Sequence, residues 1–326
     1  MRKKAVFVAP YFGKLPDCFP VFLQSCGKNP EFDWLILTDD TREYAYPSNV
    51  HCQNMTFREC VERFQSKLDF PLALPVPQKL CDFKCAYGYL FADLLEGYDW
   101  WGHCDLDQIF GKLRHFLTAD LFEKYDKIGT LGHLTLYRNT PENNQIFLSG
   151  NRFRDVCSTA KGCGFDEWMP GNINEIFLSA GKKVYTEPLG ADVSAYHTKF
   201  RLTGYHMEKG IYELDAISNS IFRWQQGELE QIYEENGQIQ RREFAYLHMQ
   251  KRSMRDLRTE TGAEVFYILP DRFVESEESP KKLLTRAKRM GWINRQFFRV
   301  KWKSLQYRLR SGDWTFNNVF RKKKIL

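Results

Sequence analysis

Two aspartates, Asp105 and Asp107, stand one residue apart at the end of the largely apolar stretch Tyr98–Cys104. The stretch predicts a buried strand, and because side chains of an extended chain alternate, both carboxylates point to the same side. Their mutual repulsion favours a shared cation. Mg²⁺ and Mn²⁺ are suitable because they take oxygen ligands and leave positions for phosphates. The pattern therefore indicates a metal–diphosphate site, with a solvated turn after a strand as the alternative.

The first half of the chain alternates between predicted strands and helices. The expected strands are 5–9, 33–38, 49–53, 98–104, 127–130 and 134–137, and the expected helices are 19–25, 56–67, 78–95 and 172–180. Thr56 and Glu59 predict a capping box at the start of the second helix. This order predicts an α/β sheet, in which ligands bind at the carboxyl ends of strands. Tyr11 and Asp39 follow the first two strands, so we expect them near the paired aspartates.

Charged residues occupy the first turns of the expected helix 78–95, namely Lys79, Asp82 and Lys84. The start of a helix attracts anions through its free N–H groups, and neighbouring lysines add to that attraction. These residues therefore indicate contact with a diphosphate. Ordinary solvated charges on a helix surface are the alternative.

A second acidic pair, Asp166 and Glu167, precedes Trp168. A carboxylate beside a large ring suits a general base next to a surface on which a sugar stacks. The alternative is an acidic pair at a helix start.

The expected strand 244–252 ends in His248, Lys251 and Arg252. His248 is a candidate third metal ligand, and the two basic residues suit a leaving diphosphate. A structural histidine is the alternative. Before this strand, the segment 221–233 predicts a hairpin that turns around Gln226 and Gly227.

Composition limits the class of protein. Hydrophobic residues make up 43% of the 326-residue chain, enough for a sizeable core. The nine cysteines form no CxxC pair, so we expect reduced thiols in a cytosolic protein. The short apolar run after the basic start is not expected to be a signal peptide or a spanning helix.

The positive charge is concentrated at the C-terminal end. Residues 281–326 hold 15 lysines and arginines and one acidic residue, Asp313, while the whole chain has a net charge of +6. A helix expected over Leu283–Arg310 carries one apolar stripe: Phe298, Trp302, Leu305 and Leu309. Basic and aromatic residues in this arrangement fit a helix at a membrane interface. A helix docked on the body with a basic outer face is the alternative.

Three segments resemble a family of bacterial glycosyltransferases of capsule and O-antigen biosynthesis, which carries a domain-of-unknown-function label. They are Pro10–Gly13, Lys79–Gly88 and Tyr98–Gly111. The later segments Phe165–Trp168 and His248–Arg252 are similar to weaker motifs of that family. The resemblance covers about residues 5–255 and implies a GT-A-like, nucleotide-sugar-binding mixed α/β sheet flanked by helices. It implies a glycosyltransferase domain at 1–275, with a nucleotide-binding half 1–140 and an acceptor half 141–275, followed by a basic helical tail, 281–326.

The resemblance also implies roles for individual residues. Asp105 and Asp107 would hold Mn²⁺ or Mg²⁺, and His248 would complete the metal shell. Tyr11 and Asp39 would face the nucleoside. The residues expected near the donor phosphates or sugar are Lys79, Asp82, Lys84 and Lys251. Asp166 or Glu167 would be the general base if the reaction inverts the anomeric centre.

The sequence therefore predicts a metal-dependent glycosyltransferase that uses a nucleotide-sugar donor, with UDP-sugars as the first class to consider. The expected acceptor is a glycan on a lipid carrier. The expected location is cytoplasmic and peripheral, with residues 281–326 on the anionic inner face of the cell membrane. Two alternatives stay open: a metal-dependent phosphohydrolase, and a nucleic-acid-binding protein that uses the basic C-terminal helix.

Overall fold

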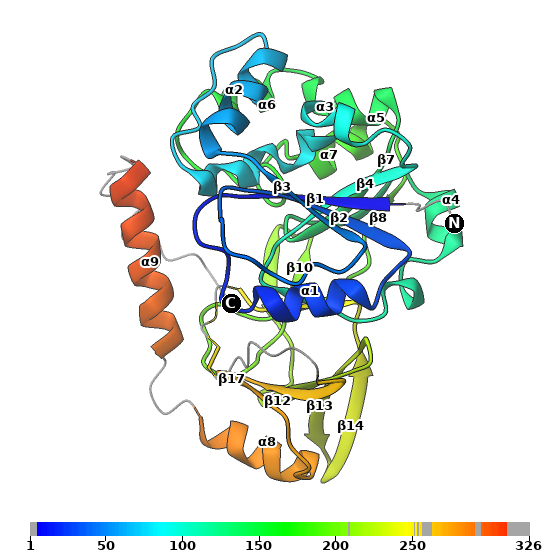
Figure 1. Cartoon of the computed structure of the whole chain (residues 1–326), viewed down its shortest axis with the longest axis vertical. Coiled ribbons are helices and arrows are strands. Elements are labelled where there is room, and N and C mark those ends of the chain that lie inside the picture. Colours follow the sequence, from blue (N-terminus) through cyan, green and yellow to red (C-terminus); the bar gives the residue numbers. More distant parts are fainter. Residues whose placement is uncertain are drawn as a thin grey trace.

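The computed structural model of the chain describes residues 5–207, 209–250, 252, 254–255, 263–290 and 295–311. A mixed sheet of seven strands forms its centre (Figure 1). In spatial order the strands are β3 (Val50–Asn54), β2 (Phe32–Thr38), β1 (Ala5–Tyr11), β4 (Trp100–Cys104), β7 (Leu134–Arg138), β6 (Lys127–Leu131) and β8 (Val184–Tyr185). Strands β3, β2, β1 and β4 are parallel, whereas β7 is antiparallel to both its neighbours. The predicted mixed α/β sheet flanked by helices is confirmed.

Helices cover both faces of this sheet. They are α1 (Phe19–Gly27), α2 (Phe57–Lys67), α3 (Tyr87–Leu90), α4 (Ala119–Lys124), α5 (Pro141–Gln145), α6 (Arg152–Cys157) and α7 (Ile173–Ser179). Short 3-10 helices lie at Pro77–Ala86, Ala92–Leu94, Leu113–His115 and Ile146–Leu148. Helices α2, α3, α6 and α7 pack on one face, and α1 and α4 on the other. Because both faces are covered, β1 is apolar throughout: Val6 and Val8 enter one core, while Phe7 and Ala9 enter the other.

Local signals in the sequence differ in outcome. The capping box of Thr56 and Glu59 forms at the start of α2, as predicted. The single helix expected over 78–95 is wrong, because the segment breaks into a 3-10 helix, the short α3 and a second 3-10 turn. Within it, Gly88 lies so close to β4 that an added Cβ would come 2.3 Å from the Trp101 ring. The absence of a side chain at Gly88 therefore allows α3 to pack closely on the sheet.

The second half of the chain contributes three smaller sheets. One joins β5 (Gln108–Phe110), β15 (Tyr246–His248) and β9 (Ala191–Asp192). Another joins β14 (Gln238–Glu243), β13 (Glu228–Glu235), β12 (Ser220–Gln225), β16 (Val265–Leu269) and β17 (Arg272–Val274), and a third pairs β10 (Thr203–His206) with β11 (Ile211–Leu214). The predicted hairpin is confirmed as β12 and β13, which turn at Gln226 and Gly227 with positive φ angles of 49° and 91°.

Two helices, α8 (Pro280–Arg289) and α9 (Arg295–Ser311), lie where one long helix was expected over Leu283–Arg310, so that expectation is wrong. Helix α8 ends at Arg289, because Met290 has an extended backbone with ψ of 128°. Its apolar side packs on β12 and β13. Among the described residues, no helix combines the length and apolar character needed to span a bilayer.

Candidate active site

The register of the small three-stranded sheet brings distant residues to the end of β4. Strand β4 stops at Cys104, and Asp105 and Asp107 follow before β5 begins. In the antiparallel pair of β5 and β15, Gln108 faces His248, and in the parallel pair of β15 and β9, His248 faces Asp192. The Met249 amide donates to the Asp107 carbonyl at 3.0 Å. Three segments of the chain therefore bring Asp105, Asp107, Asp192 and His248 together at the carboxyl end of a central strand.

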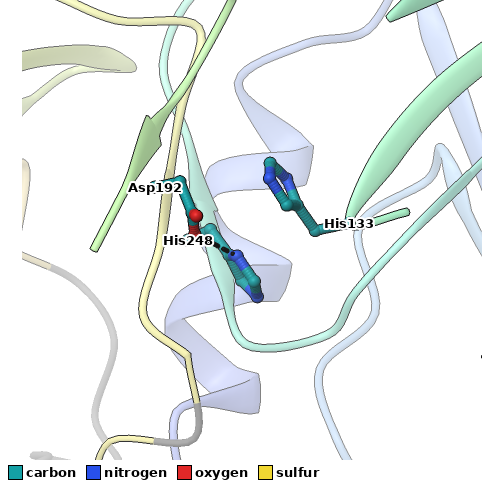
Figure 2. Close-up of side chains that lie close together, drawn as sticks. All are labelled: His133, Asp192 and His248. Atoms are coloured by element: carbon teal, nitrogen blue, oxygen red, sulfur yellow. Dashed lines mark hydrogen bonds and ion pairs between the residues drawn. The ribbon is translucent and has the colours of Figure 1, made fainter. Parts of the chain in front are cut away.

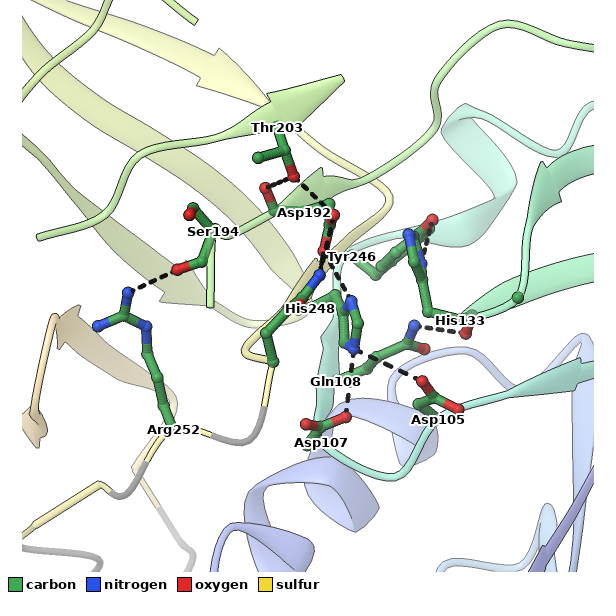
Figure 3. A network of polar contacts seen from close by, with 12 residues as sticks. Asp105, Asp107, Gln108, His133, Asp192, Ser194, Thr203, Tyr246, His248 and Arg252 are labelled. Carbon is green, nitrogen blue, oxygen red and sulfur yellow. Dashed lines mark hydrogen bonds and ion pairs between the residues drawn. The ribbon is translucent and has the colours of Figure 1, made fainter. Parts of the chain in front are cut away.

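His248 lies between the two predicted metal ligands and a third carboxylate (Figure 3). Its Nε2 atom is 3.5 Å from Asp105 Oδ2 and 3.4 Å from Asp107 Oδ1. Its Nδ1 atom is 2.7 Å from Asp192 Oδ1. A hydrogen bond from Nδ1–H to Asp192 fixes the ring and leaves Nε2 directed at the two aspartates. This is the usual arrangement of a metal-ligating histidine with its supporting carboxylate.

Burial and neighbouring charges act in opposite directions on these groups. Burial alone would lower the pKa of His248, but Asp107 and Asp192 raise it well above its ordinary value. Burial alone would raise the pKa of Asp192, but the hydrogen bond with His248 lowers it. Asp192 is therefore ionised at neutral pH, and its negative charge stabilises a positive charge at the His248 ring, carried either by a proton or by a metal ion.

Within the described part of the chain, His248 belongs to two groups of potential metal ligands. One group is Asp105, Asp107 and His248, and the other is His133, Asp192 and His248. Figure 2 shows the second group, in which the His133 and His248 rings lie face to face. Their centroids are 4.4 Å apart and their planes differ by 29°. The nitrogen lone pairs lie in the ring planes, so those of stacked rings run side by side instead of converging on one ion. The group of Asp105, Asp107 and His248 is therefore the better candidate for a metal site.

Lys84 reaches the site from the 3-10 helix Pro77–Ala86. Its ammonium group donates to Asp105 Oδ1 at 2.6 Å and to the Gly132 carbonyl at 2.8 Å. Burial alone would lower the pKa of Lys84, but Asp105 and Asp166 raise it above its ordinary value. Lys84 therefore stays positively charged and fixes the Asp105 carboxylate.

Lys79 and Asp82 belong to the same 3-10 helix and were predicted to contact the donor phosphates or sugar, but they lie in the protein interior. Both are fully buried, and the Lys79 ammonium group donates to Asp82 Oδ2 at 2.8 Å. Asp82 also accepts from the backbone N–H groups of Cys163, Gly164 and Phe165. Neither side chain has exposed surface for a ligand in this conformation. Their observed contacts position the loop that carries Asp166 and Glu167.

Asp166 and Glu167 lie beside the candidate metal ligands. Gly132 links the two sets, because its N–H donates to Glu167 and its carbonyl accepts from Lys84, which also holds Asp105. The Gly132 N–H donates to Glu167 Oε1 at 2.7 Å, and the Tyr212 hydroxyl donates to Glu167 Oε2 at 2.8 Å. Asp166 is buried, and burial together with Glu167 raises its pKa well above the ordinary value. A Cβ on Gly132 would come 2.0 Å from Asp166 Oδ2, so a larger residue there would force the Asp166 carboxylate to move. The exposed ring of Trp168 follows this pair.

The two predicted nucleoside contacts lie at neighbouring strand ends. Tyr11 ends β1, and burial together with the nearby Asp107 raises its pKa. Asp39 follows β2 and accepts from the Gly13 N–H at 2.6 Å. Lys251 lies outside the described residues, so its role stays a prediction. The other basic residue assigned to the diphosphate, Arg252, instead donates to the backbone carbonyls of Thr198, Pro270 and Ser194.

A model of a family of unknown function, DUF6625, matches residues 7–277. The chain belongs to this family. The match includes the seven-stranded sheet, apart from the first two residues of β1, together with Asp105, Asp107 and His248.

Solved structures similar to this DUF6625 member include the galactosyltransferase LgtC in complex with donor and acceptor sugar analogs. The identity is 12% and the TM-score 0.33, over 58% of this chain and 75% of that chain. An active-site mutant of LgtC aligns with 13% identity and a TM-score of 0.31, over 58% of this chain and 74% of that chain. No protein with a curated description matches in sequence. The function proposed below therefore rests on the residues of the site.

Sequence reasoning missed the residues that hold His248. The Asp192 carboxylate accepts from Gln250 Nε2 at 2.8 Å and from the Thr203 hydroxyl at 2.7 Å, in addition to His248. Gln250 has a positive φ of 49°, an unfavourable backbone conformation for a residue with a side chain. Gln250 lies beyond the end of β15 at His248, so the alternation of side chains along a strand does not predict its position. Predicting the contact of Asp192 with His248 requires the register between β9 and β15, which the sequence does not reveal.

Proposed function

We propose that the chain is a metal-dependent glycosyltransferase that uses a nucleotide-sugar donor. The observation that supports this most is the convergence of Asp105, Asp107 and His248 at the carboxyl end of β4, with potential ligand atoms within 4.8 Å of one another. Two carboxylates and one imidazole suit Mn²⁺ or Mg²⁺, and they leave coordination positions for the oxygens of a diphosphate.

When bound, the metal would supply Lewis acidity to the leaving diphosphate. The chain's own residues then have separate tasks. Asp192 holds the His248 ring with Nε2 toward the site, and Lys84 holds Asp105. Lys84 also adds positive charge beside the expected position of the phosphates. Tyr11 and Asp39, at the neighbouring strand ends, are the proposed nucleoside contacts, and Lys251 remains a proposed phosphate contact.

For an inverting reaction, Glu167 is the better candidate base of the acidic pair. Burial and the neighbouring Glu167 raise the pKa of Asp166 and so favour its protonated form, which suits a hydrogen bond donated to a sugar oxygen. Glu167 accepts hydrogen bonds from the Gly132 N–H and the Tyr212 hydroxyl, and these fix the orientation of its carboxylate. The neighbouring Trp168 offers a ring for the acceptor sugar. We further propose that the acceptor is a lipid-linked glycan of the kind used in surface-polysaccharide synthesis.

A phosphohydrolase with two metal ions needs two complete ligand sets about 3.5–4 Å apart. In the described ranges, the two groups of potential ligands compete for His248. One metal with a diphosphate-linked substrate therefore fits the residues better than a two-metal centre.

A thermal-shift screen of nucleotide sugars, with Mn²⁺ and with EDTA, tests the proposal. A donor that binds the folded chain raises its melting temperature by mass action, and the shift should require Mn²⁺. A donor identified in this way should then be hydrolysed or transferred by the wild-type chain and not by Asp105→Ala. Absence of any shift across UDP-, GDP-, CMP- and dTDP-sugars would contradict the proposal.

A further inference from the structure

Helix α9 contacts the body of the protein along one side. Gln296 is buried, and the Phe297 ring lies 6.2 Å from the Tyr196 ring. The Lys301 ammonium group sits 5.7 Å from the centre of the same tyrosine ring. In Figure 1, α9 runs along the edge of the molecule, apart from the sheets. These contacts fix which side of the helix faces outward.

The outward side carries an apolar stripe. Phe298, Trp302, Leu305 and Leu309 follow one another at intervals of four, three and four residues, which places them on the same side of a helix. Phe298 is 66% exposed, Trp302 62% and Leu309 47%. Such large apolar side chains in one row are seldom left in water, and a row of this kind marks an interaction surface.

Positive charge surrounds the stripe. Arg299 and Lys303 lie on α9 beside it, and neither α8 nor α9 contains an acidic residue. The whole segment 281–326 holds 15 basic residues and one acidic residue. An apolar row flanked by cations matches a bilayer surface, where acyl chains lie beneath anionic phosphates.

We propose that α9 is a membrane-binding helix that inserts Phe298, Trp302 and Leu309 among anionic lipids. A second copy of the chain fits less well, because like charges would face each other across the interface. Nucleic acid also fits less well, because Leu305 and Leu309 offer no ring for base stacking. The proposal goes beyond the glycosyltransferase function and does not depend on it.

Vesicle flotation of the full chain tests this surface. The probes are vesicles of phosphatidylcholine alone and of phosphatidylcholine mixed with phosphatidylglycerol. We expect binding to the mixed vesicles only, weakened by salt. Phe298→Ala combined with Trp302→Ala should reduce the bound-to-free ratio by about tenfold or more, because two large side chains no longer insert. The matched control is Leu178→Ala, which removes a side chain that is 45% exposed on α7 and should leave binding unchanged.

Three results would overturn the proposal. They are no binding of wild type to the anionic vesicles, equal binding by the double variant, and an equal loss in the Leu178→Ala control. Gel filtration and titration with a fluorescent oligonucleotide distinguish the other partners. If the double variant keeps vesicle binding but loses dimerisation, the apolar stripe binds a second copy of the chain. If it keeps vesicle binding but loses oligonucleotide binding, the stripe binds nucleic acid. Donor binding in solution should be the same in wild type and double variant, so this test is separate from that of the proposed function.

Discussion

Asp192 offers a direct test of how the site is held together. Its Oδ1 atom accepts from His248 Nδ1 at 2.7 Å, and the same carboxylate accepts from Gln250 and Thr203. Changing Asp192→Asn keeps the shape but removes the negative charge that supports the imidazole. Loss of such a supporting group typically weakens metal binding about 10–100-fold, or about 1.4–2.7 kcal/mol. We expect Mn²⁺ affinity to fall within that range.

Electron paramagnetic resonance of free Mn²⁺ measures this affinity without any substrate. Thr203→Val is the matched control, because Thr203 donates to Oδ2, the oxygen that does not hold His248. The control should lose less than about threefold in affinity, because the Asp192 charge and its hydrogen bond with His248 both remain. If Asp192→Asn remains folded by circular dichroism and binds Mn²⁺ within twofold of wild type, the assigned role of Asp192 is wrong.

Three further predictions concern the surroundings of the site. Gly132→Ala would place a Cβ against Asp166, so we expect a loss of about 1–3 kcal/mol in unfolding free energy and lower transfer activity. The control Gly204→Ala has open space around the new Cβ and should leave both quantities unchanged. Lys79→Met leaves Asp82 buried without its partner and should cost about 3–5 kcal/mol by urea unfolding; a cost below about 1 kcal/mol would contradict the assigned pairing. Burial lowers the pKa of Lys127 to about 7. Between pH 7 and 9, Lys127 therefore loses its proton in the folded chain but keeps it in the unfolded chain, so stability rises with pH. The unfolding free energy of wild type should therefore increase by about 2 kcal/mol more than that of Lys127→Met from pH 7 to 9. If the difference between the two proteins in unfolding free energy stays constant over this range, the prediction is wrong.

The parts of the fold that the sequence predicted depend on local pattern. Uninterrupted apolar runs marked the central strands, and Thr56 with Glu59 marked the start of α2. The pair of positive φ angles at Gln226 and Gly227 matches the turn expected from the sequence there. The same kind of local reasoning brought Asp105 to the end of β4, because it needed only the period of one strand.

The parts that could not be predicted depend on contacts between distant segments. Asp192 reaches His248 only through the pairing of β9 with β15. Lys79 and Asp82 were predicted near the donor phosphates or sugar, and their burial could not be foreseen because it comes from a loop about eighty residues further along the chain. The outward direction of the Trp302 stripe depends on which side of α9 meets Tyr196, and the helical period alone carries no such information.

The central claim is that Asp107 helps to hold a metal that binds the donor. Isothermal titration of a nucleotide sugar identified by the thermal-shift screen, into wild type and Asp107→Asn, with Mn²⁺ and with EDTA, tests it most directly. We predict that Mn²⁺ tightens donor binding to wild type by about tenfold or more, as expected for a metal that bridges carboxylates and phosphates. In the folded Asp107→Asn variant, affinities with Mn²⁺ and with EDTA should be nearly equal. A folded variant that keeps the full effect of Mn²⁺, or a wild type that shows none, would contradict the account.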